Sequence, residues 1–348
     1  MPFFPALEPR RDRRDTVNSV NKAAAFKGIG FFFGPLALFV TSLPANAQVQ
    51  VTAVGNDHVA IEINGQPFSN FYFGTSYAKP FLAPLRSATG QVVTRRFPME
   101  RVEGETNDHP HHKGLWIGYG DVNRINFWES EPESKPSGDN PKDKGLIRLE
   151  KLGEIKSGKK TGSVTATFGW ITPQNEQLLE EEQTIVFHAD DKFRRVDVDL
   201  LLTARAKVDF GDTKEGFFAI RVADSMSGKN GGIMTNGEGA HTEKDVWGKS
   251  ADWVDYVGTV DGQKTGILIL DHPGNTKHPA RWHARDYGLF AVNPFGLAEF
   301  NPKASSKGGL HMNPGDTAHF RYRVIVHAGD VSKRDIARWY SDYAKSKK

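Results

Sequence analysis

Apolar and polar residues alternate with a period of two along much of this chain, and this pattern constrains the fold most strongly. The segments Val164–Phe168, Val196–Leu200 and Phe320–Val326 each place their apolar side chains on one face of an extended backbone. His58–Ile63 alternates in the same way and ends at an Asn-Gly pair typical of a hairpin turn. Many short strands at close spacing predict an all-β fold, a large antiparallel β-sandwich.

Other segments fit the same plan. Gln177–His188 and Gly266–Leu270 are predicted strands, and Gln91–Phe97 is predicted to be a strand that leads into the histidine-rich segment described below. The C-terminal segment differs, because apolar residues recur there at helical spacing after Ser332, a typical N-cap. We therefore expect one sandwich domain over residues 48–348 that ends in a helix, with an exposed loop at about 130–145, where Pro, Ser, Gly and charged residues are frequent.

The first 47 residues have the organisation of a secretory signal peptide. A basic segment precedes the apolar run Ile29–Leu43, and Ala45-Asn46-Ala47 forms a small-x-small cleavage site before Gln48. The apolar run is shorter than the ~20 residues that a spanning helix needs. We expect cleavage after Ala47 and a periplasmic or secreted protein with no membrane segment after leader removal.

Charge and cysteine content exclude several classes of function. The leader holds six Lys/Arg and three Asp/Glu, so the formal net charge of +3 comes from the leader and the remainder is balanced. A balanced chain offers no electrostatic footprint for nucleic acid. The absence of cysteine excludes disulfides, thiolate metal sites and a cysteine nucleophile. Oligomeric state is not predicted by any of these features.

The segment Val102–Trp128 is the leading candidate for a functional site. It combines glycines and two tryptophans with a dense set of ionisable groups, and buried ionisable groups are costly unless they are paired. We therefore expect the segment to line a cleft. If the segment is extended, His109 and His111 share one face and His112 lies on the other. Its histidines and carboxylates are His109, His111, His112, Glu103, Glu105, Asp108 and Asp121.

A second segment of similar chemistry spans residues 236–300. Seven of the twelve histidines fall in the windows 109–112 and 241–283, which suggests one cleft built from two parts of the sheet. The candidates in the second window are Glu238, His241, Glu243, His272, Trp282, His283, Arg285 and Asp286.

Three chemistries are compatible with these residues. Histidines titrate near neutral pH and suit acid–base catalysis or substrate hydrogen bonding. Two carboxylates at ~5–10 Å would suit glycoside hydrolysis, with Glu105 or Asp108 paired to Glu238 or Glu243. Histidines joined by a third ligand would suit a divalent metal, although no ligand-spacing motif is present. No cofactor is predicted, and a His-bound divalent metal stays an alternative.

Several motifs resemble those of the PmoA-like family, a group of bacterial, often exported proteins labelled methane oxygenase. The resemblance spans the chain after the leader and is carried by TRRFPM at 94–99, GETNDHPHHKGLW at 104–116, GDVN at 120–123, FW at 127–128, GEGAH at 237–241, DHPGN at 271–275, HPARWHARDYGLF at 278–290 and NPFG at 293–296. Methane chemistry is not expected, because the membrane methane monooxygenase subunit is an integral membrane protein, whereas this chain is expected to have no membrane segment after its leader. The resemblance instead implies partners among saccharide-degrading systems and a galactose-mutarotase-like supersandwich, in which His and Glu or Asp line a sugar cleft.

We therefore predict a carbohydrate-active enzyme that acts at or near a glycosidic carbon, most simply a hydrolase, with a lyase or epimerase as alternatives. A non-catalytic carbohydrate-binding protein and a His-ligated metal-dependent oxidase or hydrolase are the other candidates. The predicted catalytic residues are His111, His112, His109, Glu105, Asp108, His241 and Glu243. The predicted substrate-binding residues are Arg95, Arg96, Asn123, Trp128, Glu238, His272, Trp282, His283, Arg285 and Asp286.

Overall fold

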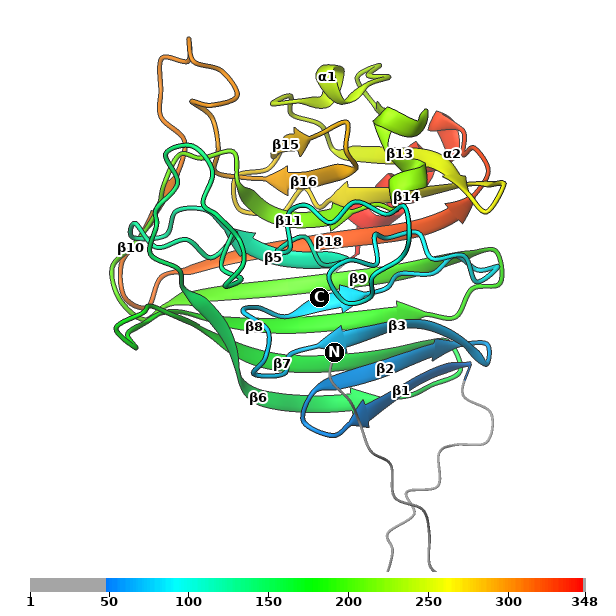
Figure 1. Cartoon of the computed structure of the whole chain (residues 1–348), viewed down its shortest axis with the longest axis horizontal. Coiled ribbons are helices and arrows are strands. Elements are labelled where there is room, and N and C mark those ends of the chain that lie inside the picture. Colours follow the sequence, from blue (N-terminus) through cyan, green and yellow to red (C-terminus); the bar gives the residue numbers. More distant parts are fainter. Residues whose placement is uncertain (1–47, 347–348) are drawn as a thin grey trace, which may run out of the picture. The chain divides into compact units, whose positions relative to one another are not determined.

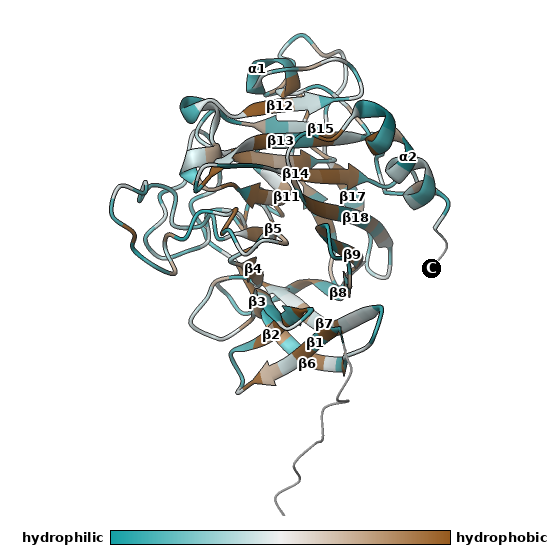
Figure 2. Cartoon of the chain, turned by 90° about the vertical axis from the view of Figure 1, so that its right-hand side faces the viewer, coloured by the Kyte–Doolittle hydropathy of each residue, from teal (hydrophilic) through white to brown (hydrophobic). Residues whose placement is uncertain are grey.

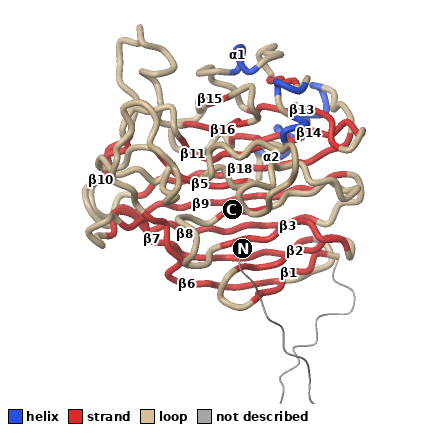
Figure 3. Tube along the Cα trace, viewed as in Figure 1, coloured by secondary structure: helices blue, strands red, loops and turns tan. Residues whose placement is uncertain are grey.

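The computed structural model describes residues 48–346, and the predicted signal peptide at 1–47 lies outside the described residues. Strands are the main regular secondary structure of the described chain, which has few helices and many loops (Figure 3). Two eight-stranded sheets and a two-stranded ribbon account for the strands, and each paired strand is antiparallel to its neighbours (Figure 1). No helix within residues 48–346 combines the length and apolar character needed to cross a membrane.

The first sheet has the strand order β1-β2-β3-β4-β5-β11-β16-β15. Its strands are β1 (Val49–Val54), β2 (His58–Ile63), β3 (Gln66–Tyr72), β4 (Phe81–Ala83), β5 (Leu115–Tyr119), β11 (Gly216–Arg221), β16 (Leu289–Asn293) and β15 (Arg281–Ala284).

The second sheet has the order β12-β13-β14-β18-β9-β8-β7-β6. Its strands are β12 (Ile233–Asn236), β13 (Trp253–Val260), β14 (Gln263–Asp271), β18 (Thr317–Ala328), β9 (Phe193–Ala204), β8 (Gln177–His188), β7 (Thr161–Ile171) and β6 (Leu146–Lys156). The ribbon pairs β10 (Val208–Phe210) with β17 (Leu310–Met312). The helices are α1 (Glu243–Val246), α2 (Lys333–Ala344) and the 3-10 turns η1 (Asp224–Met226) and η2 (Gly228–Asn230).

The main hydrophobic core lies between the two sheets. Phe71 of β3 contacts Phe168 of β7 with ring centroids 6.1 Å apart, and Phe218 of β11 stacks on Tyr322 of β18 at 4.4 Å. Strands such as β11, β14 and β18 are strongly hydrophobic, whereas α2 is largely hydrophilic (Figure 2). Burial of alternate residues against a facing sheet produces the period of two in the sequence. The predicted antiparallel β-sandwich with a C-terminal helix is confirmed.

The C-terminal helix covers part of the outer face of the second sheet. Ser332 is its N-cap, and the Ser332 hydroxyl accepts a hydrogen bond from the Asp335 N–H at 3.1 Å. Ile336 and Tyr343 are buried against side chains of β13, β14 and β18. The helix therefore lies on the sheet that does not carry the histidine-rich segment.

One predicted strand is wrong. Residues 91–97 contain only isolated bridges, of which Thr94 with Val222 is the one nearest the histidine-rich segment. The Thr94 hydroxyl accepts a hydrogen bond from the Leu85 N–H at 3.0 Å, and Arg95 points its buried guanidinium at Asp108. The side chains of Thr94 and Arg95 hold neighbouring loops in place. The segment therefore does not form a regular strand, although its apolar and polar residues alternate.

Candidate functional site

The three histidines of the His-Pro-His-His run come together because the run is a turn. His109 has a left-handed backbone (φ 44°), and the His112 N–H donates to the His109 carbonyl at 2.9 Å. The rings of His109 and His112 stack with centroids 4.8 Å apart, and those of His111 and His112 lie 4.3 Å apart. The expectation that an extended segment would place His112 opposite the other two is wrong, because the closed turn reverses the chain between them.

Gly114 lets the chain pass from this turn into β5. Its φ of 54° lies in the left-handed region, and a Cβ there would collide with the carbonyl oxygen of Leu82. Only glycine satisfies both conditions without strain. The turn is thereby fixed at the start of β5, directly beside Trp116.

A row of side chains across five neighbouring strands forms the floor of the site. Cross-strand partners point to the same face of a sheet, and strand register places one row on the outer face of the first sheet: Phe81, Trp116, Ala219, Ala291 and His283. Trp128 covers the two small alanines, because its ring centroid lies 5.1 Å from that of Trp116 and 6.5 Å from that of His283. This row connects the two histidine-containing windows of the sequence.

Two buried arginines fix the histidine turn. Arg95 donates to an Asp108 carboxylate oxygen at 2.5 Å and to the His109 carbonyl at 2.8 Å. Arg221, the last residue of β11, donates to the same Asp108 oxygen at 3.0 Å and to Nδ1 of His112 at 3.2 Å. Burial opposes ionisation of Asp108, but hydrogen bonding from His109 and the charges of Arg221 and Arg95 hold the pKa of its carboxyl well below the usual range.

The contact with Arg221 determines the tautomer of His112. A guanidinium can only donate, so Nδ1 of His112 must accept and the ring proton resides on Nε2. Burial, followed by the neighbouring His111 and Arg221, lowers the pKa of His112 well below its ordinary value. His112 is therefore neutral near pH 7 and presents an N–H donor.

His111 is neutral for related reasons but has a different partner. Burial and the nearby Lys79 ammonium lower its pKa well below the ordinary value. Its Nδ1 lies 3.0 Å from the Ser134 hydroxyl, which belongs to the loop after Trp128. When Nδ1–H donates to Ser134, the lone pair on Nε2 is available to accept a proton.

The loop at 130–145 has no helix or strand, and its tip is exposed. Its beginning is nevertheless buried, because Ser130, Glu131 and Ser134 pack beside the site. Glu131 forms an ion pair with the buried Lys113. Burial lowers the pKa of the neighbouring Lys79 to about 7, and its ammonium donates to the Trp128 carbonyl at 2.8 Å.

The second window supplies a wall next to this floor. His283 ends the row, and its Nδ1 lies 3.7 Å from an oxygen of the buried Glu215. Trp247 contacts His283 edge-on at 5.1 Å, and the Arg285 guanidinium lies 3.8 Å from the Trp247 ring centroid. A pocket of about 330 Å³ opens here, lined by Glu243, Lys244, Trp247, Ala284, Arg285 and Asp286.

Several predicted site residues have other contacts. Both carboxylate oxygens of Glu105 accept backbone N–H groups, from Arg96 at 2.9 Å and Phe97 at 2.8 Å. The Arg96 side chain itself lies 3.8 Å from Glu100 at the surface. Asn123 ties a turn to the start of β10 through the Lys207 carbonyl and the Asp209 N–H, both at 2.7 Å.

The remaining predicted residues of the second window diverge. Trp282 points into the main core and donates to the Ala251 carbonyl at 2.9 Å. His272 packs edge-on against Tyr343 of α2, on the other sheet. Glu238 and His241 are exposed near α1, and within residues 48–346 neither forms a hydrogen bond or ion pair through its side chain with the histidine turn. Only His283, Arg285, Asp286 and Glu243 contribute to the wall.

Three residues of the site were not predicted from the sequence. Arg221 ends the apolar run FFAIR, and a lone charge in such a run indicates a buried charge that needs a partner. Tyr287 lies in the segment 278–290 that carries the family resemblance, and its ring stacks on His109 at 5.0 Å and under Arg221 at 4.5 Å. Glu215 precedes β11 without any local signal.

The side chains around the histidine turn do not form a cluster of metal ligands in the described part of the chain. Within the described part of the chain, no group of three or more His, Asp or Glu side chains is arranged to hold a metal ion. Nδ1 of His112 is used by Arg221, and Nδ1 of His111 by Ser134. A His-bound divalent metal stays a prediction.

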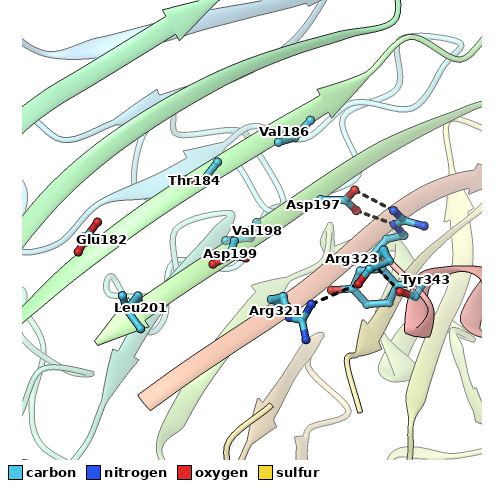
Figure 4. Close-up of a pocket in the computed structure, with 11 residues that line it drawn as sticks. Glu182, Thr184, Val186, Asp197, Val198, Asp199, Leu201, Arg321, Arg323 and Tyr343 are labelled. Atoms are coloured by element: carbon cyan, nitrogen blue, oxygen red, sulfur yellow. Dashed lines mark hydrogen bonds and ion pairs between the residues drawn. The ribbon is translucent and has the colours of Figure 1, made fainter. Parts of the chain in front are cut away.

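A larger pocket of about 430 Å³ lies on the outer face of the second sheet, beside α2 (Figure 4). Its Arg323 is held by Asp197 through two hydrogen bonds at 2.5 and 2.8 Å, and Arg321 reaches the Ser346 carbonyl at 3.4 Å. None of the predicted site residues lines it. We therefore place the candidate site on the first sheet.

Comparison of the sequence with protein families identifies the chain. Residues 58–341 match the model of a family of unknown function, DUF6807. The chain belongs to the DUF6807 family. No curated protein matches this DUF6807 chain significantly.

Solved structures that are similar to this chain share little sequence identity with it. A galactose mutarotase-like protein from Clostridium acetobutylicum is 10% identical (82% of this chain and 99% of that chain covered, TM-score 0.39). A galactose mutarotase related enzyme from Lactobacillus acidophilus is 6% identical (82% and 98%, TM-score 0.32), and an alpha-galactosidase from Lactobacillus brevis is 10% identical (85% and 41%, TM-score 0.40). At these TM-scores we draw no conclusion about activity.

Proposed function

We propose that this DUF6807 protein is an exported carbohydrate-active protein that acts on a saccharide at or near its glycosidic carbon. The carrying observation is that two partly exposed aromatic rings border the histidine-containing row on one sheet face. Tyr287 stacks on His109, next to the neutral His111 and His112, and Trp247 contacts His283 at the other end of the row. Sugars combine apolar C–H faces with hydroxyl groups, and aromatic rings beside a few fixed polar groups suit both.

The two histidines are assigned different tasks. His112 donates from Nε2–H to a sugar oxygen, because Arg221 occupies its Nδ1. His111 transfers the proton, because its ring is neutral and Ser134 orients it. Hydrolysis by paired carboxylates is less well supported, since Glu105 and Asp108 are both engaged elsewhere. Epimerisation or elimination by proton transfer is therefore the reaction type that we favour over hydrolysis.

The test is turnover of a panel of oligosaccharides in D₂O by the protein and its His111→Gln and His112→Gln variants. Epimerisation by proton transfer at carbon predicts deuterium in the product, whereas elimination predicts an unsaturated product that absorbs in the ultraviolet. Each variant should lose roughly 10²–10⁴-fold in rate. His311→Gln is the matched control, because His311 is exposed on β17 and pairs only with Asp209. Undiminished turnover by both site variants would remove the histidines from the mechanism, and a saturated product without deuterium on carbon would restore hydrolysis.

A non-catalytic carbohydrate-binding protein is the second candidate. It is favoured by the strong engagement of Asp108 with Arg95 and Arg221, which leaves this carboxylate a structural role. Binding of a saccharide with no product after prolonged incubation would select this candidate.

A further inference from the structure

The guanidinium of Arg285 lies over the ring of Trp247 and, among the described residues, has no hydrogen-bond or ion-pair partner. Its Cζ is 3.8 Å from the Trp247 ring centroid, whereas its backbone is fixed by a hydrogen bond from its N–H to the Leu289 carbonyl at 2.8 Å. Across residues 48–346, its side chain forms no hydrogen bond or ion pair. The five N–H donors of a guanidinium form a planar fork, so a strong donor group remains unused beside the site.

Trp247 is held in place from several sides. The backbone N–H of Trp247 donates to the Glu243 carbonyl at 2.8 Å at the end of α1, and a β-bridge joins Trp247 to Trp282. Phe300 and His283 contact its ring edge-on at 4.9 and 5.1 Å. The indole is therefore a fixed platform, and stacking on it presets the plane of the guanidinium.

The charges of the pocket leave the fork available. Glu243 and Asp286 line the same pocket of about 330 Å³ and are balanced by Lys244 and Arg285. Within the described chain, neither carboxylate lies within ion-pair distance of Arg285. An incoming anion would thus find the donors of Arg285 unoccupied.

A buried histidine without a hydrogen bond lies next to the pocket, with Glu215 at 3.7 Å as its nearest carboxylate. His283 is 1% exposed, and neither of its ring nitrogens forms a hydrogen bond with any residue of the described range. Buried polar groups are nearly always paired, so an orphaned one calls for a ligand or bound solvent. His283 contacts Trp247 edge-on at 5.1 Å, at the end of the cross-strand row.

We propose that Arg285, stacked on Trp247, binds the negatively charged group of an acidic saccharide, a uronate carboxylate or a sulfate ester. This inference rests on the proposed function and names its substrate class. A planar carboxylate or two oxygens of a sulfate accept two parallel N–H bonds from the fork, which are roughly twice as strong as neutral hydrogen bonds. Neutral sugars cannot use the fork in this way.

The test is calorimetric binding of matched neutral, uronate and sulfated oligosaccharides to the full chain and its variants. Arg285→Gln should lower affinity for acidic ligands by about tenfold or more and change affinity for neutral ligands by less than about twofold. Arg285→Lys keeps the charge without the fork and should recover only part of the loss. Arg338→Gln on the exposed face of α2 is the control.

The outcomes separate the two proposals. Preference for uronate or for sulfate identifies the source of the charge and supports the inference. Binding of neutral sugars alone, or an equal effect of Arg285→Gln on all ligands, overturns the acidic-saccharide assignment and leaves the proposed function intact. Binding of no saccharide from any set overturns both.

Discussion

Arg221 holds together more of the candidate site than any predicted residue does. It is fully buried at the end of β11 and contacts Asp108, His112 and the Tyr287 ring. Its positive charge adds to the hydrogen bond from His109 in lowering the pKa of Asp108, and to burial and His111 in lowering the pKa of His112. A sequence shows the arginine but not these partners, which are more than 60 residues away.

Replacing Arg221 with Gln should raise the pKa of His112, because both a positive charge and a donor to Nδ1 are removed. NMR titration of the ring nitrogens should show the wild-type His112 in the Nε2–H tautomer at pH 7 and a higher apparent pKa in the variant. Arg124→Gln is the control, since Arg124 is exposed and pairs with Asp121. An unchanged His112 titration would show that Arg221 does not set its protonation.

Glu181 predicts a pH-dependent stability. It lies fully buried in the core, accepts hydrogen bonds from Trp170 (2.7 Å) and from Gln183, and burial raises its pKa to about 7. Because the folded-state pKa exceeds the unfolded value, the folded protein binds the extra proton, and this group costs stability as pH rises from about 4.5 through 7.

Glu181→Gln should therefore remove a loss of up to about 3 kcal/mol between pH 5 and pH 8. Denaturant unfolding at both pH values measures it, with the exposed neighbour Glu182→Gln as control. The same pH slope in wild type and Glu181→Gln would show that Glu181 does not titrate in this range.

At the scale of elements, the loop at 130–145 connects the site to the surface. The Lys144 ammonium donates to the carbonyls of Glu131 and Ser134, both at 2.6 Å, and to that of Pro132 at 3.3 Å. This lysine holds the loop so that the Ser134 hydroxyl meets His111. Loops with few buried apolar contacts depend on such hydrogen bonds.

Lys144→Met should speed amide exchange in the loop and weaken saccharide binding several-fold, while the sheets keep their protection. Hydrogen exchange read by mass spectrometry measures both effects, and Lys142→Met, an exposed lysine of the same loop, is the control. Loss of protection in β5 or β11 would instead mean that Lys144 supports the sandwich itself.

At the scale of the whole molecule, the first strand begins just after the predicted cleavage site. Val49 is fully buried and starts β1, which pairs with β2 from Val49 to Val54. Cleavage after Ala47 would leave this strand intact, whereas cleavage several residues later would remove a core residue. The leader motif and the position of β1 therefore both predict cleavage directly before Gln48.

Expression in a bacterial host should give an exported protein that begins at Gln48. N-terminal sequencing of the periplasmic or secreted fraction measures this. A retained leader would contradict the signal-peptide prediction, and a start beyond Val51 would contradict the assignment of β1 as part of the core.

The sequence alone determined several of the strands and part of the composition of the site. The alternations at 164–168, 196–200 and 320–326 became β7, β9 and β18, and Gln177–His188 became β8 with the same bounds, because burial on one face of a strand is written locally. The same holds for Ser332 as the N-cap of α2. The PmoA-like resemblance stays a prediction.

Only the tertiary structure decided which residues share the site. Cross-strand register aligned Trp116 with Ala219, Ala291 and His283, although these residues are far apart in sequence. In the folded chain, the Glu105 carboxylate accepts backbone N–H groups and His272 packs against α2. Arg221, in contrast, lies within hydrogen-bond distance of His112. The physical reason is that alternation specifies which face of a strand is buried, whereas strand order and side-chain partners depend on contacts made after the sheets assemble.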